Sequence, residues 1–242
     1  MSAVVFFLLG DAVLLALAVA GAFVARWPQG PALVYSAVLA ITTALLIGAL
    51  VQLLGGTKSE ALVLPLGLPW IGAHFRVDAL SAFFLVVINL GGAAASLYGL
   101  GEARHEHSPG RVLPFFPAFL AGMNLVLVAD DAYAFLLSWE FMSIASWALV
   151  MAHHREGGNA RAGYVYLVMA SFGTFMLLLA FALLASPAGG YAFDAMRAVT
   201  PTPAVAGLAF ILALIGAGSK AGIVPVHGCR SPIPPRRAMS PR

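Results

Sequence analysis

Seven stretches of about 20 apolar residues follow one another along the chain, and a helix of that length can cross a bilayer. We expect membrane helices at roughly Ala3–Ala25, Pro31–Leu54, Ala79–Leu100, Val112–Ala129, Ala132–Ala152, Ala162–Ala185 and Ala204–His227. Only 10% of the residues are charged, against about 25% in soluble domains. The sequence therefore predicts an all-α integral membrane protein, with one transmembrane bundle over residues 1–227.

The charge balance does not favour a nucleic-acid-binding surface. The formal net charge is +3, but four of the thirteen basic residues lie in the last fifteen positions, 228–242. The rest of the chain carries nine basic and ten acidic side chains. The only cysteine, Cys229, also lies in this tail, so the bundle lacks the ligands of an iron–sulfur cluster or a common zinc site. We expect no metal, no cofactor and no catalytic centre.

The distribution of positive residues predicts the orientation. One set of links between spans contains Arg26, Arg104, Arg111, Arg155 and Arg161, whereas the opposite set contains Lys58, Arg76 and Arg197. Because the side richer in positive residues is usually cytoplasmic, we expect the N-terminus outside a bacterial-type cell (inner) membrane. The links 55–78 and 191–203 would then be short extracellular loops.

Glu140 lies deep in the fifth predicted span. It follows Asp131 by nine residues, or about 13 Å along a helix, which places it near the middle of the bilayer. A charge at that depth costs about 2.5–3.5 kcal/mol. A protonated glutamate that bonds a neighbouring helix is one interpretation. The other, a protonatable site on an ion path, is favoured because intramembrane acids usually line such paths.

Lys220 lies in the last apolar span, among Gly216, Gly218 and Gly222 and ahead of Pro225. Proline removes a helical hydrogen bond, so the segment is typical of a transport helix that breaks inside the membrane. A desolvated lysine releases its proton readily. If the span ends at His227, however, Lys220 lies near an interface and can act as an anchor. Both interpretations stay open at this point.

Three further polar residues fall within predicted spans. For Asp11, Asn89 and Asn124 we expect hydrogen bonds between helices. Asp130 and Asp131 open the fifth span, where carboxylates suit a helix N-terminus. No phosphate loop, nucleophile triad or dinucleotide fingerprint is present.

Three segments resemble the antiporter-like, proton-conducting membrane subunits of the complex I family: DDAYAFLLSWEFMSIASWALVMAHH, RAGYVYLVMASFGTFMLLLAFALL and FILALIGAGSKAGIVPVH. The resemblance extends from about Leu66 to His227. It is strongest to the hydrogenase-type branch, which contains hydrogenase-4 component B and formate hydrogenlyase subunit 3. The resemblance implies a larger bundle of about fourteen helices, of which this chain holds the N-terminal part, and further membrane subunits as partners.

The resemblance also implies residue roles. Glu140 corresponds to the glutamate of the fifth helix and Lys220 to the lysine of a broken seventh helix, which together form the first half of a proton channel. Pro225 would break that helix, and His227 is a possible accessory residue. Ser171 stands where many relatives carry histidine, so we assign no relay role there.

The tail 228–242 does not continue the membrane pattern, because it contains four arginines and four prolines. In the family, the preceding motif is followed by a segment similar to WLPLAHPAAPSHVSA. Encoded in GC-rich codons and read one base later, that segment gives GCRSPIPPRRAMSP, the residues found here from position 228. We therefore expect an out-of-frame, disordered tail and a truncated subunit.

Three functions fit the sequence. The first is a truncated proton-translocating subunit of a hydrogenase or NADH-dehydrogenase-like complex. The second is a subunit of a multisubunit Na⁺/H⁺ antiporter, and the third is a structural membrane anchor without transport. The sequence does not distinguish H⁺ from Na⁺ as the transported ion.

Overall fold

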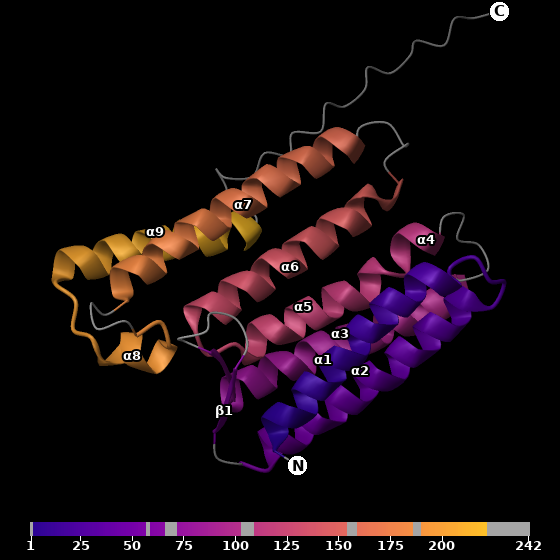
Figure 1. The fold of residues 1–242 in the computed structure, drawn as a ribbon, viewed down its shortest axis with the longest axis horizontal. Coiled ribbons are helices and arrows are strands. Elements are labelled where there is room, and N and C mark those ends of the chain that lie inside the picture. The colour runs from indigo at the N-terminus through magenta and orange to yellow at the C-terminus, as the bar shows by residue number, and fades with distance from the viewer. Residues whose placement is uncertain are drawn as a thin grey trace, which may run out of the picture.

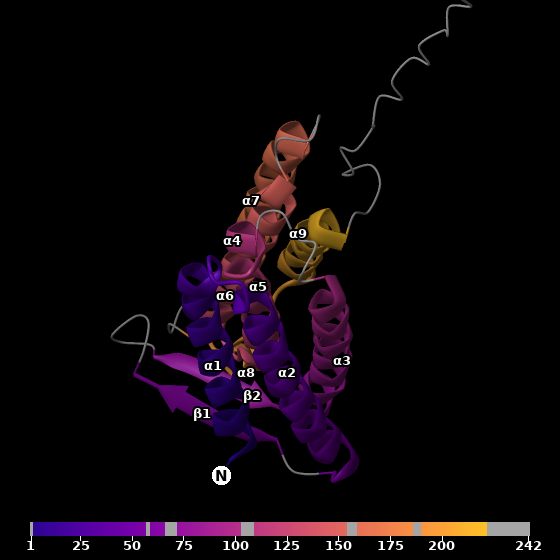
Figure 2. The same ribbon diagram turned by 90° about the vertical axis from the view of Figure 1, so that its right-hand side faces the viewer.

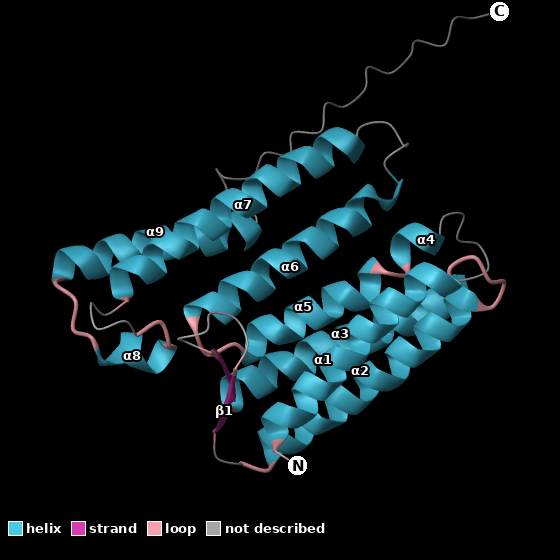
Figure 3. Cartoon of the chain, in the orientation of Figure 1, coloured by secondary structure: helices cyan, strands magenta, loops and turns pink. Residues whose placement is uncertain are grey.

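Long helices make up most of the computed structural model, which describes residues 2–56, 59–65, 72–102, 109–153, 159–185 and 190–221. The helices are α1 (Ala3–Val24), α2 (Gly30–Leu54), α3 (Ala79–Glu102), α4 (Pro109–Val112), α5 (Phe115–Val128), α6 (Ala132–Val150), α7 (Asn159–Leu184), α8 (Phe193–Ala198) and α9 (Pro203–Ala221), with a 3₁₀ turn at Met151–His153. Two short strands, β1 (Glu60–Leu64) and β2 (Ala73–Val77), complete the described elements (Figure 3).

The seven predicted spans are confirmed. Seven described segments have the length and the apolar composition to cross a membrane, with α4 and α5 together forming the fourth. The last span is described as far as Ala221, whereas its expected continuation to His227 lies outside the described residues. The expected helix break at Pro225, His227 itself and the tail 228–242 lie outside them as well.

The helices pack in a connected series that places α6 between two groups (Figure 1). On one side α1, α2, α3 and α5 form a four-helix group, and on the other side α7 packs along α9. The main buried cluster lies in the four-helix group and includes Phe7, Leu14, Val38 and Leu85. Large apolar side chains such as Phe23, Leu54 and Phe210 point outwards, as expected for helices that face lipid.

A β-hairpin occupies the link after α2, which we had expected to be a plain loop. Strands β1 and β2 pair antiparallel, with Leu62 opposite Phe75. Figure 2 shows the two strands beside the N-terminal end of α1, where Glu60 accepts a 2.6 Å hydrogen bond from the Ala3 backbone N–H. Apolar and polar residues alternate in Ala73–Val77, a pattern typical of a strand. We overlooked this pattern because the segment lies between two long apolar spans.

The turn between α5 and α6 fixes the position of α6. Its Asp130 backbone N–H donates to the carbonyl of His74 (2.8 Å), and the carbonyl of Asp130 accepts from Phe193 N–H (3.0 Å). The side chain of Asp130 accepts a 3.0 Å hydrogen bond from Arg76 Nε. Burial raises the pKa of the Asp130 carboxyl above its usual value, and the Arg76 guanidinium partly offsets this effect. The hairpin and the α7–α8 link thus hold the start of α6 from two sides.

Candidate functional site

Glu140 and Lys220 both reach the face of α6 that is turned towards the α7–α9 pair. Helix α6 begins at Asp131, whose side chain caps it by accepting a 2.7 Å hydrogen bond from the Ala134 backbone N–H. This confirms the expected carboxylate at the helix N-terminus. Glu140 lies eight residues after Ala132, about 12 Å along the helix. The cap therefore sets the depth at which the Glu140 carboxyl enters the bundle.

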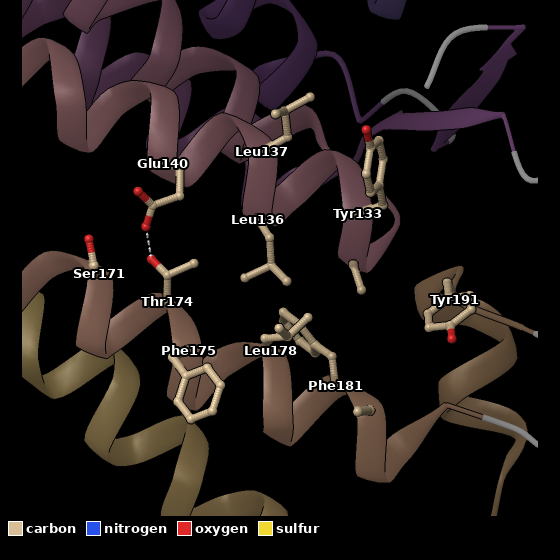
Figure 4. A pocket seen from close by; sticks show the side chains of 12 residues that line it. Tyr133, Leu136, Leu137, Glu140, Ser171, Thr174, Phe175, Leu178, Phe181 and Tyr191 are labelled. Carbon is tan, nitrogen blue, oxygen red and sulfur yellow. Dashed lines mark hydrogen bonds between the residues drawn. The ribbon is translucent and has the colours of Figure 1, made fainter. Parts of the chain in front are cut away.

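Glu140 turns its half-buried side chain towards α7. Its Oε1 atom accepts a hydrogen bond from the hydroxyl of Thr174, as Figure 4 shows. The Thr174 hydroxyl also lies 3.2 Å from the carbonyl of Ala170, one turn earlier on α7. The contact joins the two helices at the depth of the carboxyl.

Lys220 points into the bundle from the last turn of α9. Its ammonium donates a 2.5 Å hydrogen bond to Ser143 Oγ on α6. The Nζ atom also lies 5.7 Å from the ring centre of Trp139 and 5.3 Å from that of Tyr166, within the range of cation–π attraction. One hydroxyl and two aromatic rings therefore surround the positive charge.

The depth of Lys220 bears on the anchor interpretation. Its partner Ser143 lies eleven residues after Ala132, about 16 Å along α6. That depth is near the middle of a hydrocarbon core about 30 Å thick. The lysine side chain is directed towards α6, and the described helix ends at the next residue.

Glu140 and Lys220 come close without bonding each other. Glu140 is bonded to Thr174 and Lys220 to Ser143. Ser143 follows Glu140 by three residues on α6, so the two side chains are neighbours on one helix face. The residue that binds the ammonium therefore lies about one helical turn from Glu140 on α6.

Two glycines allow α9 to lie close enough for this contact. A Cβ atom on Gly216 would lie 2.8 Å from the carbonyl oxygen of Gly173, and one on Gly173 would lie 2.9 Å from that of Gly216. Both distances are shorter than a real side chain tolerates. The backbones of α7 and α9 approach here as small residues permit in membrane bundles, one turn before Lys220.

A cavity of about 790 Å³ extends from Glu140 along α6 and α7 (Figure 4). Ser171 and Thr174 lie beside Glu140 at one end, and Tyr133 and Tyr191 lie at the other. Most of the remaining wall is apolar, formed by leucine, phenylalanine and alanine side chains. Ser171 is exposed to this space and donates to no charged residue in the described part of the chain.

Sequence reasoning missed the direct partners of the two charged residues. Ser143 and Trp139 flank Glu140 in the segment SWEFMS, whereas Thr174 and Tyr166 come from α7. The helical spacing of Trp139, Glu140 and Ser143 predicts a shared face of α6. Nothing in the sequence, however, indicates which face meets α7 and α9.

Comparison with known proteins places these helices among antiporter-like subunits. Residues 129–228 match the family model described as NADH:quinone oxidoreductase/Mrp antiporter, TM. Hydrogenase-4 component B of Escherichia coli is 36% identical over 154 residues, which cover 63% of this chain and 23% of that protein. An uncharacterised protein of Mycobacterium tuberculosis is 38% identical over 161 residues, 66% of this chain and 25% of its own length.

A solved structure extends the likeness to the fold. A chain of the membrane-bound sulfane sulfur reductase, an archaeal respiratory membrane complex, superposes with a TM-score of 0.71 at 22% identity, over 89% of this chain and 45% of that chain. The present chain spans about a quarter of the length of these two relatives. Over its membrane helices the chain is thus similar to antiporter-like membrane subunits of the NADH:quinone oxidoreductase/Mrp antiporter family and to hydrogenase-4 component B.

Proposed function

We propose that this chain forms the N-terminal part of a proton-translocating subunit of a hydrogenase or complex I-like membrane assembly. Glu140 and Lys220 would be the charged pair of its first half-channel. The observation that carries the proposal is the position of the Lys220 ammonium, bonded to Ser143 one turn from Glu140 on the same helix.

This arrangement supports a lysine with two alternative partners. The lysine side chain has a flexible four-carbon stem, and Ser143 lies three residues from Glu140, about 4.5 Å along the helix. When Lys220 pairs with Glu140, the positive charge favours the ionised carboxylate. When Lys220 returns to Ser143, the carboxyl loses that stabilisation in an apolar setting and takes up a proton. Movement of the lysine thus couples to proton uptake and release at Glu140.

The cavity beside Glu140 supports access for the proton. It leads from the carboxyl towards Tyr133 and Tyr191, near the start of α6. On the orientation we predict, that end faces the outside, and water entering the cavity would connect Glu140 to that side. The N-terminus would lie on the same side of a bacterial-type inner membrane.

The test is proton uptake by membrane vesicles that contain the chain together with the subunits encoded beside it. E140Q and K220M should each reduce uncoupler-sensitive uptake to the level of vesicles without the chain, while the assembly stays intact on native gels. S171A is the matched control, because Ser171 lines the same cavity and has no assigned role. Unchanged uptake by E140Q would assign Glu140 to helix packing and favour a structural anchor.

A Na⁺/H⁺ antiporter subunit is the second candidate, because the matched family model includes Mrp antiporters. Imposed Na⁺ and proton gradients distinguish the two. Uptake that needs Na⁺ on the opposite side of the membrane would favour the antiporter, whereas uptake in Na⁺-free vesicles favours proton translocation alone. Genes for [NiFe] hydrogenase subunits beside this one would favour the hydrogenase assembly.

A further inference from the structure

Asp11 is a buried acid that the site around Glu140 does not use. It lies in the middle of α1 and is only 1% exposed. Neither carboxyl oxygen makes a hydrogen bond, although the side-chain amide of Asn124 is directed towards it. We had expected Asp11 to bond a neighbouring helix, and for the described residues that expectation is wrong.

The two buried asparagines nearby are largely occupied by each other. Asn89 Nδ2 donates to Asn124 Oδ1 at 3.0 Å and to the carbonyl of Leu85 at 2.9 Å. Asn124 Nδ2 returns a longer bond of 3.4 Å to Asn89 Oδ1. This pair confirms the interhelical hydrogen bond expected for the two asparagines. It leaves one Asn124 N–H for Asp11 and no free amide oxygen to join the carboxyl in holding a cation.

The helices around Asp11 offer no opposite charge. Helix α1 packs against α5, α2 and the hairpin. Helices α2 and α5 contain no acidic or basic side chain, and the phenol of Tyr35 is the only ionisable group on them. Helix α3, which holds Asn89, has two ionisable residues, Tyr98 and Glu102, both in its last two turns and neither of them basic.

The charged groups of the hairpin lie at the end of α1, away from Asp11. Glu60 bonds the backbone at Ala3, whereas His74 and Arg76 contact the aspartates of the α5–α6 turn. An ionised Asp11 would thus lie in an apolar core with one amide donor and no ion pair. Buried carboxylates are not found in such surroundings, because the neutral acid is far more stable there.

We propose that Asp11 is a second proton-binding site of this chain, separate from Glu140, and that it holds its proton at neutral pH. The ligand is a proton rather than Na⁺, since a sodium ion needs several free oxygen ligands and the carboxyl has only occupied amides beside it. Gly122 of α5 packs against Met142 of α6. Asn124 follows Gly122 by two residues and Glu140 precedes Met142 by two, so Asn124 lies near the depth of Glu140. Helix α5 separates Asp11 on α1 from Glu140 on α6.

Infrared spectroscopy of the 242-residue chain in membranes tests the proposal. Aspartate labelled with ¹³C in the side-chain carboxyl separates its carbonyl band from that of glutamate, and E140Q removes the other mid-membrane acid. We expect a band of protonated aspartic acid at pH 7. D11N, a neutral substitution of similar shape, should abolish this band, whereas D194N, at an exposed position, should leave it.

Three results would overturn the proposal: no protonated-aspartate band at neutral pH, a band that survives D11N, or loss of the band on adding Na⁺ at constant pH. If D11N does not fold, D11S provides the same comparison. Because the test is made in the E140Q background, its outcome is independent of whether Glu140 translocates protons.

Discussion

Replacing Ser143 by alanine removes the one hydrogen bond that joins the Lys220 ammonium to the described part of the chain. Ser143 is fully buried, so water does not readily replace its hydroxyl. A hydrogen bond to a charged group contributes about 1.5–3 kcal/mol, whereas neutral bonds between membrane helices average about 0.6 kcal/mol. The cation–π contacts with Trp139 and Tyr166 remain in the variant. We therefore expect S143A to lower the free energy of unfolding by about 1.5–3 kcal/mol.

A double-mutant cycle isolates this interaction. The chain, S143A, K220M and the double variant are unfolded by detergent titration in mixed micelles, and the coupling energy is taken from the four free energies of unfolding. S96A is the matched control, because the buried Ser96 hydroxyl donates to the carbonyl of Gly92 on α3 and contacts no charged group there. S143T restores a hydroxyl and should recover part of the loss. A coupling energy near 0.6 kcal/mol, the value for neutral pairs, would refute the reasoning that Ser143 holds a charged lysine.

Other expected outcomes follow from packing, charge and orientation. G216L should separate α7 from α9, because its Cβ would lie 2.8 Å from Gly173 O. The free energy of unfolding should then fall, whereas G207L, at a position open to its surroundings, should change it little. As burial raises the Asp130 pKa, ionised Asp130 destabilises the fold at neutral pH. Stability relative to D130N should therefore rise as the pH falls from 7 towards the ordinary aspartate value of about 3.9; a constant difference would contradict this. Reporter fusions after Arg26 and Arg155 should indicate cytoplasm and a fusion after Arg197 the outside; two fusions of opposite sign would overturn the orientation.

The amino-acid sequence by itself determined the class of protein and the positions of its membrane helices. Apolar runs of about 20 residues leave few alternatives, because a backbone in lipid must satisfy its hydrogen bonds within the helix. Glu140 and Lys220 could also be singled out from the sequence, because the free energy of placing a charged side chain in the bilayer is unfavourable whichever helices surround it. The N-terminal cap at Asp131 was also predictable, because capping depends on neighbours in the chain.

Only the tertiary structure decided which side chains those charges meet. Ser143 and Thr174 lie 77 and 34 residues from their partners Lys220 and Glu140, and helical periodicity says nothing about which helices are adjacent. The contrast between Asn89, which finds Asn124, and Asp11, which makes no hydrogen bond, is of the same kind. All three residues are polar side chains in apolar helices. Their contacts differ because packing brings Asn89 and Asn124 within hydrogen-bonding distance of each other but brings no donor that close to Asp11.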